Sequence, residues 1–375
     1  MKVNLFFTNG VMTTLCASLL CEALFFDEKE FKNIICLEQF DEHDEFYNIV
    51  INEIISISGI WENKYSVQSN YHNFSRKNLI HSMQLTGYYK FIAAALKKKL
   101  NKDKYDHFEN IIFSSTARLW PYFRTSSNKK ILIEHGSGEY IYVKNRYRKK
   151  SSYLKLWLTK IWNMIFQYEC LSNYSNLDTI YLCSELVKFN EELSLVCHVD
   201  TQKAFCKLAD NFWENYKKKF PDEYSELNVI REELGKNKDN FYYLVSNEVD
   251  PMKYPDFIQY QKEKAALPEK GYYIIKSHPS NDENSYNEIY SCLGTSVTVK
   301  QIINKYIPAE FLIYFFDKVT VIGSNSSTLL YVKTWMPHIP VIRTKIPDKI
   351  MISKGFENLQ DQIDIIFDGI NFIEI

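Results

Sequence analysis

The stretch KVNLFFTNGVMTTLCASLLCEALFF (residues 2–26) sets the pattern that the rest of the chain repeats. Its apolar start, KVNLFF, is typical of a buried strand, Thr8-Asn9-Gly10 is a turn at the strand's exit, and residues 11–25 have the spacing of an amphipathic helix. A secretory signal peptide is the alternative interpretation. Because the turn interrupts the apolar stretch and only one basic residue precedes it, we expect mature structure of a cytoplasmic protein.

Apolar runs of this kind recur and alternate with helical patterns. They are VNLFF (3–7), NIICLEQF (33–40), NIIFSS (110–115), KKILIEH (129–135), FYYLVSN (241–247), GYYIIKSHP (271–279) and KVTVIGSNSS (318–327). In the first half, helical segments are expected near residues 45–57, 78–100 and 116–124. Strands that alternate with helices predict an α/β fold with parallel sheets covered on both faces.

The length of 375 residues predicts about two domains. Residues 213–240 are polar and charged without a clear buried strand, and they separate the two sets of strands. We therefore predict two Rossmann-like domains, residues 1–235 and 236–375, with their sheets facing a central cleft. Ligands of such sheets bind at the carboxyl ends of the strands.

Charge and cysteine content exclude several classes of protein. Lys and Arg together number 45 against 46 Asp and Glu, so the overall charge does not indicate a nucleic-acid partner. None of the eight cysteines is in CxxC spacing, which favours buried reduced thiols over zinc ligands. The one dense acidic stretch, DEHDE (41–45), is typical of a solvated loop, and no Asp-x-Asp follows a strand.

Three polar segments follow predicted strands and could carry chemistry. The first is ILIEHGSGEY (131–140), where Glu134 could act as a general base and Gly136 leaves room for a substrate; a plain turn is the alternative. The second is YYIIKSHPSNDEN (272–284), where His278 could donate to a leaving phosphate. The third is KVTVIGSNSSTLLYVKTW (318–335), where hydroxyls at a helix start could bind an anion or simply cap the helix.

Taken together, IEHGSGEY, KSHPSNDE and GSNSSTLLY resemble, in order and spacing, the three motifs of bacterial sialyltransferases. Those motifs are an acidic pair followed by Gly, a His-Pro, and a Ser/Thr pair. The likeness is to the polysialyltransferase and lipooligosaccharide sialyltransferase type. It implies a GT-B fold, a CMP-sialic acid donor, inversion at the anomeric carbon, and no requirement for a metal or another cofactor.

The resemblance also implies roles for individual residues. Glu134 would be the base on the acceptor hydroxyl, and His278 would stabilise or protonate the departing CMP phosphate. Ser326 and Ser327 match the Ser/Thr pair that holds this phosphate, with Ser324 and Thr328 beside them. By position, Ser246 and Asn247 are expected in the nucleotide pocket, and Asn9 and Gly10 near the acceptor.

The sequence departs from the motif at His135, where the second acidic residue is expected. If the base belongs to this second position, His135 would have to carry it; alternatively, it could contact the donor carboxylate. The alternatives to a CMP-sialic acid donor are CMP-Kdo and UDP- or GDP-sugars in the same fold. A non-catalytic scaffold at the membrane is the alternative from a different class.

A basic, aromatic segment, KNRYRKKSSYLKLWLTKIWNMIF (144–166), contains no acidic residue. It is typical of a core-facing helix after a basic loop, or of an interfacial helix on anionic lipid at the inner face of the plasma membrane. Nucleic-acid binding is a weaker alternative. No apolar run reaches the roughly 20 residues that span a bilayer. The sequence leaves open the acceptor glycan, the linkage, mono- or polysialylation, and the oligomeric state.

Overall fold

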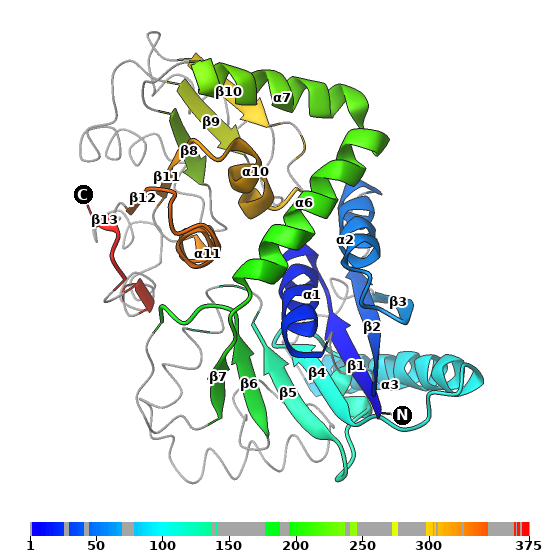
Figure 1. Ribbon diagram of the computed structural model, residues 1–375. Helices are drawn as coiled ribbons and strands as arrows, with labels where there is room; N and C mark the ends of the chain where they lie inside the picture. Colours follow the sequence, from blue (N-terminus) through cyan, green and yellow to red (C-terminus); the bar gives the residue numbers. More distant parts are fainter. Residues whose placement is uncertain are drawn as a thin grey trace. The chain divides into compact units, whose positions relative to one another are not determined.

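The computed structural model divides the chain into two compact units, Met1–Ala204 and Phe205–Ile375. Each unit contains one parallel β-sheet with helices packed on it (Figure 1). The structure describes residues 2–25, 30–40, 45–69, 79–134, 136, 140, 177–187, 195–236, 241–245, 272–276, 298–302, 304, 307–323, 326–343, 364, 366–367 and 370–374. The predicted α/β architecture with two Rossmann-like sheets is confirmed.

The sheet of the first unit has seven strands in the order β3-β2-β1-β4-β5-β6-β7. Its strands are β1 (Lys2–Thr8), β2 (Phe31–Phe40), β3 (Asn63–Ser69), β4 (Asn110–Ser114), β5 (Lys129–Ile133), β6 (Thr179–Leu182) and β7 (Val196–His198). All neighbouring strands run parallel. The polar strand β3 was not expected from the sequence, because its residues lack the apolar pattern of the buried strands beside it.

The helices of this unit are α1 (Val11–Phe25), α2 (Glu45–Ser58), α3 (Leu79–Lys102) and the single 3₁₀ turn η2 (Trp120–Tyr122). The chain moves from β1 outward to β3 and then returns to β4 on the other side of β1. Since parallel crossovers are right-handed, this reversal puts α1 and α2 on one face and α3 on the other, as Figure 1 shows.

Two helix predictions for this unit need correction. The helix at 11–25 exists, but Thr13–Cys21 are all buried, so α1 is enclosed rather than amphipathic; it lies on the sheet and packs against α2. Residues 116–124 do not form an α-helix. There, the backbone N–H groups of Arg118 and Leu119 donate to the buried carboxylate of Glu38, and Pro121 lies within the short turn η2.

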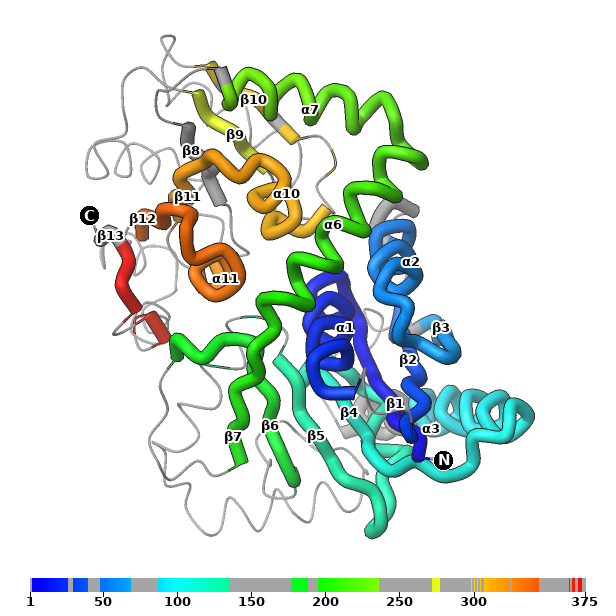
Figure 2. Tube along the Cα trace, in the orientation of Figure 1, coloured from blue at the N-terminus to red at the C-terminus, as the bar shows by residue number. Residues whose placement is uncertain are grey.

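The sheet of the second unit has six parallel strands in the order β10-β9-β8-β11-β12-β13. They are β8 (Phe241–Val245), β9 (Tyr272–Lys276), β10 (Thr298–Ile302), β11 (Thr320–Gly323), β12 (Val341–Arg343) and β13 (Ile373–Glu374). The helices are α6 (Gln202–Lys219), α7 (Pro221–Lys236), α10 (Ala309–Phe316) and α11 (Ser327–Trp335). The Cα trace in Figure 2 follows the same path.

Residues 213–236 of the polar stretch taken as a connector between the domains form the second part of α6 and all of α7, and they belong to the second unit. The division between the units therefore falls at 204/205 rather than at 235/236. The physical reason is the apolar face of α6, because Phe205 and Phe212 pack against Phe311 of α10. The indole N–H of Trp213 also donates to the carbonyl of Phe311 at 3.0 Å.

Candidate functional site

Two of the three motifs follow strands that are close neighbours in the sheet of the second unit. Strand β8 lies between β9 and β11, with Val245 opposite Lys276 and Leu244 opposite Ile322. The segments that leave these three strands therefore start at the same carboxyl edge. The order of strands also reverses between β8 and β11, and such a switch point is where open α/β sheets bind ligands.

The Ser/Thr motif forms the start of α11. Ser326 is the N-cap residue, and its hydroxyl oxygen accepts the backbone N–H of Thr328 at 3.2 Å. Ser326 and Thr328 are buried, whereas Ser327 is half-buried and its hydroxyl has no partner among the described residues. The cap does not exclude the predicted anion site, since an N-cap leaves other N–H groups of the first turn available to an anion.

A buried pair of ionisable residues lies next to this helix start. Lys276 ends β9 and is 8% exposed, and Glu310 lies in the first turn of α10 and is 1% exposed. The Thr328 side chain hydrogen-bonds to the Glu310 carboxylate, yet the Oε1 atom of Glu310 has no hydrogen-bond partner among the residues that the structure describes. A buried carboxylate oxygen left unpaired costs free energy that a ligand's hydroxyl or amino group could recover.

Burial shifts the pKa of each group in the direction that favours its neutral form. Desolvation lowers the pKa of Lys276 to about 8, against the opposing charge of Glu310. Desolvation likewise raises the pKa of Glu310, although hydrogen bonds from its own N–H and from Thr328, and the charge of Lys276, act against it. Perturbed ionisable groups at a strand-end ligand site are candidates for function.

The sequence-based predictions did not include Lys276 or Glu310. Two signals were available: Lys276 precedes the His-Pro motif by two positions, and Glu310 is the only charged residue in the run IPAEFLIYFF (307–316). A single acid in so apolar a run has to be buried or bound. What the sequence could not supply is the contact with Thr328, which the packing of α10 against α11 creates.

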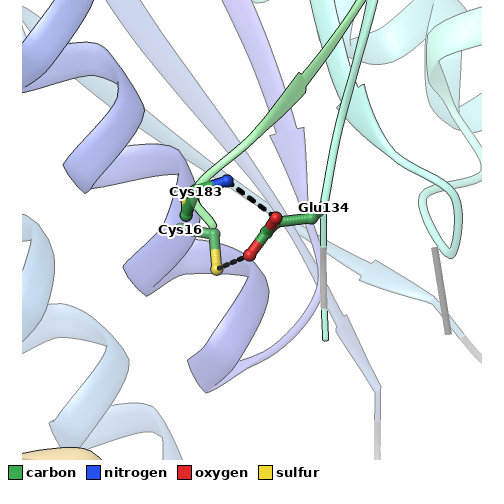
Figure 3. A group of neighbouring side chains, drawn as sticks. All are labelled: Cys16, Glu134 and Cys183. Carbon is green, nitrogen blue, oxygen red and sulfur yellow. Dashed lines mark hydrogen bonds between the residues drawn. The ribbon is translucent and has the colours of Figure 1, made fainter. Parts of the chain in front are cut away.

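Glu134, the predicted base, directly follows β5 and is fully buried. Figure 3 shows its carboxylate between Cys16 and Cys183. Its Oε2 atom accepts hydrogen bonds from the Tyr140 hydroxyl and from the backbone N–H of Cys183 at 2.8 Å. The thiol of Cys16, on α1, lies 4.0 Å from Oε1. The carboxylate thus ties the ends of β5 and β6 to α1.

Cys16, Glu134 and Cys183 form the one group of possible metal ligands found in the described part of the chain. The ligating atoms of Cys16, Glu134 and Cys183 all lie within 4.8 Å of one another. Burial, followed by the hydrogen bond with Cys16 and the charge of Glu134, raises the pKa of Cys183 well above its usual value. This favours a protonated thiol, so the group has the properties of a hydrogen-bonded core cluster more than of a metal centre.

Gly136 has a conformational role in the segment that follows β5. The backbone φ of Gly136 is +133°, a conformation that L-residues rarely adopt, so glycine is needed there for the backbone itself.

Asn9 and Gly10 lie where β1 passes into α1: the Asn9 N–H donates to Thr13, and its side-chain oxygen accepts from Thr116 at 2.8 Å. This contact joins the carboxyl ends of β1 and β4, at the switch point of the first sheet.

Several predicted residues lie outside the described part of the chain. They are His135, Ser246, Asn247, His278, Ser324 and the segment 144–166. Their predicted roles stay predictions. Among the helices that the structure describes, none has both the length and the apolar character needed to cross a bilayer.

Comparisons with solved structures find the same fold. The chain superimposes on an α/β-galactoside α-2,3-sialyltransferase from Photobacterium phosphoreum with a TM-score of 0.53 and 13% identity, covering 98% of this chain and 97% of that one. A sialyltransferase from Photobacterium damsela gives 0.51 and 11%, covering 100% and 81%. S. aureus MnaA, in a structure with UDP, gives 0.51 and 11%, covering 92% and 79%.

No protein-family model matches the sequence, and a search of curated protein sequences finds no significant match. At identities this low, the structural likeness establishes the fold and nothing finer. The chain therefore has a GT-B-type fold of two Rossmann-like units.

Proposed function

We propose that this protein is a glycosyltransferase that moves sialic acid from CMP-sialic acid to a hydroxyl of a bacterial surface glycan, a capsule or lipooligosaccharide precursor. The observation that carries the proposal is the edge of the second sheet. There, the strands that precede the His-Pro and Ser/Thr motifs both border β8, and the buried pair Lys276 and Glu310 lies beside them. A GT-B-type fold shared with two sialyltransferases supports it.

In this proposal, the second unit binds the donor nucleotide. The start of α11 receives the phosphate through free backbone N–H groups and the hydroxyls of Ser326 and Ser327, with Ser324 beside them. His278 donates a hydrogen bond or a proton to the phosphate as it leaves. Ser246 and Asn247, which follow β8, line the nucleotide pocket at the switch point.

Glu310 and Lys276 complete the nucleotide site. The Oε1 atom of Glu310, for which the described part of the chain offers no partner, accepts a hydrogen bond from a ribose hydroxyl, the role that acidic residues serve in other Rossmann-like nucleotide sites. Lys276 supplies positive charge close to the phosphate. Because Thr328 hydrogen-bonds to Glu310, the nucleotide also holds the start of α11 in place.

The first unit supplies the base. The acceptor oxygen attacks the anomeric carbon and its proton passes to the base, while the bond from that carbon to the phosphate oxygen breaks and CMP leaves; the configuration inverts. The enclosed carboxylate of Glu134 favours His135 as the group that meets the acceptor hydroxyl. Glu134 then positions the end of β5, and Gly136 gives the backbone its required turn.

The reaction in this form needs no metal and no other cofactor, since the helix start, His278 and Lys276 stabilise the leaving phosphate. We place the protein in the cytoplasm, where nucleotide sugars are available, with peripheral contact to the inner face of the plasma membrane. Nucleic acid is not a proposed partner. Asn9 and Gly10 are proposed to contact the acceptor.

The second candidate is the same chemistry with another donor, CMP-Kdo or a UDP- or GDP-sugar. It is favoured by the likeness to S. aureus MnaA, whose structure contains UDP and which superimposes as well as the second sialyltransferase does. A non-catalytic scaffold at the membrane is the remaining alternative, and it predicts no nucleotide binding.

A thermal-shift series with CMP, UDP and GDP separates these candidates, because a ligand that binds the folded state raises its melting temperature. We expect CMP alone to raise it, and Glu310→Ala to reduce the shift at a given CMP concentration. Glu226→Ala, which removes an exposed carboxylate from α7, is the matched control and should keep it. A shift with UDP or GDP instead would favour the second candidate, and no shift with any nucleotide would favour the scaffold.

A further inference from the structure

Helix α3 (Leu79–Lys102) has an exposed face unlike those of the other long surface helices. Phe91 is 75% exposed, the highest value among the large hydrophobic side chains of the described residues. Gly87, Ala94 and Ala95, one turn away on either side, are also exposed, so small side chains leave the ring uncovered. An exposed apolar strip along a helix is therefore present here.

The charged side chains of α3 itself are all positive. The exposed lysines of the helix are Lys90, Lys97, Lys98, Lys99 and Lys102, and its sequence contains no aspartate or glutamate. Lys97 lies over the ring of Phe123, 5.2 Å from its centre. The nearest acid in the sequence, Asp103, follows the helix and accepts a hydrogen bond from Tyr65. In a protein with a net charge of −1, such a one-sided face is a local concentration of charge.

The opposite face of α3 anchors it firmly to the protein. Tyr89, Ile92, Ala93, Leu96 and Leu100 are buried. The exposed strip is thus presented by a helix that packing holds in place. In Figures 1 and 2, α3 lies at the border of the first unit and extends beyond β1 and β2, away from α1 and α2.

Helices α6 and α7 show what an ordinary solvated face looks like in this chain. The exposed side of α6 carries Lys207 together with Asp210 and Glu214. Val229 of α7, the second exposed large hydrophobic residue among those described, is 50% exposed and has the exposed charges of Glu226, Arg231 and Glu232 near it along the helix. Mixed charge of this kind is typical of surfaces that face only water.

We propose that α3 is a docking surface for an anionic lipid bilayer, with Phe91 entering the interface and the flanking lysines contacting acidic headgroups. Charge complementarity and the exposed aromatic ring carry the choice of partner. A polyanionic glycan would also be attracted by the lysines and is included in the test as a competitor, whereas helices that lie in a membrane interface combine an exposed apolar side chain with flanking lysines. The inference does not depend on the proposed enzymatic activity, and it concerns a surface other than residues 144–166.

The test is co-sedimentation of the full chain with vesicles of phosphatidylcholine alone or mixed with phosphatidylglycerol. We expect binding only to the mixed vesicles and weaker binding at high salt. Phe91→Ser should lower the vesicle affinity roughly tenfold. Lys98→Glu combined with Lys102→Glu should lower it roughly thirtyfold or more.

Matched controls keep the test decisive. Val229→Ser and the pair Lys218→Glu and Lys219→Glu remove an exposed hydrophobic residue and two exposed helix-end lysines from the second unit, and both should bind like the unmodified chain. Thermal unfolding checks that the α3 variants still fold. The proposal is wrong if the unmodified chain does not bind, or if the α3 variants bind as well as it does. It is also wrong if only Lys149→Glu with Lys150→Glu weakens binding, or if Phe91→Ser has no effect while a polyanionic glycan competes.

Discussion

The backbone N–H of Cys183 donates a 2.8 Å hydrogen bond to the carboxylate of Glu134, so the ends of β6 and β5 are joined through a fully buried side chain. The Tyr140 hydroxyl donates to the same oxygen. A carboxylate enclosed in this way is suited to holding two strand ends in register. Reaching an acceptor hydroxyl in solvent would require these contacts to open.

Glu134→Gln therefore tests whether this residue positions or reacts. We expect it to lower the free energy of unfolding by about 1–3 kcal/mol, because an amide cannot accept all the hydrogen bonds that the carboxylate accepts. Some transfer activity should remain, with an unchanged pH profile, and Tyr140→Phe should behave similarly. His135→Ala should abolish transfer while stability is kept. If Glu134→Gln is fully stable but inactive while His135→Ala is active, then Glu134 rather than His135 is the general base.

Substitutions at Glu310 should separate nucleotide binding from folding. Glu310→Gln keeps an oxygen that can accept from a ribose hydroxyl and should raise KM for the donor only severalfold, whereas Glu310→Ala should raise it by about tenfold or more. Glu310→Ala should also lower the unfolding free energy, because buried Lys276 loses its opposing charge and Thr328 loses its hydrogen-bond partner, whereas Glu310→Gln should cost less. Steady-state kinetics beside chemical denaturation measure both. An unchanged KM for Glu310→Ala would contradict the assignment.

Glu38 makes the stability of the first unit depend on pH. Its carboxylate is 1% exposed, and burial raises its pKa to about 7 although the N–H groups of Leu119 and Arg118 donate to it. Between about pH 4.5 and 7 the folded state holds a proton that the unfolded state has lost, so the stabilisation present at low pH is lost as pH rises through 7. The difference can reach roughly 3 kcal/mol.

The measurement is chemical denaturation of the unmodified protein and of Glu38→Gln from pH 5 to 8. We expect the unfolding free energy of the unmodified protein to fall relative to that of the variant as pH rises. Parallel curves would mean that Glu38 does not titrate in this range.

Ser326 and Ser327 should differ although they are neighbours. Ser326 caps α11, so Ser326→Ala should cost about 1 kcal/mol of stability in addition to any effect on the donor. Ser327 is half-buried and has no partner among the described residues, so Ser327→Ala should leave stability unchanged and weaken donor binding. Denaturation and nucleotide titration of both variants check this; equal effects on stability would contradict the distinct roles.

The sequence predicted the secondary structure correctly where the local pattern of apolar and polar residues agrees with the fold. The strand, turn and helix of residues 2–25, and the strands before the His-Pro and Ser/Thr motifs, follow from apolar runs that end in polar turns. The prediction failed where a contact between segments distant in the sequence decides the secondary structure. The N–H groups of Arg118 and Leu119 donate to Glu38, 80 and 81 positions away in the sequence. The α-helix expected at residues 116–124 does not form, because these N–H groups are used in that contact.

The candidate site divides in the same way. The motif residues could be named from sequence, because their meaning lies in short stretches. The burial of Glu134 and the grouping of Lys276, Glu310 and Thr328 could not, because these residues meet only after strands and helices have packed. The enclosed α1 was similarly unexpected, since its apolar content was assigned to one face.

The most direct measurement is release of CMP from CMP-sialic acid by the purified protein, with galactosyl and sialyl acceptors and with EDTA present. We predict that CMP appears together with a sialylated product, that EDTA does not slow the reaction, and that His278→Ala abolishes it. If the donor stays intact with every acceptor while a UDP- or GDP-sugar is consumed, the protein is not a sialyltransferase.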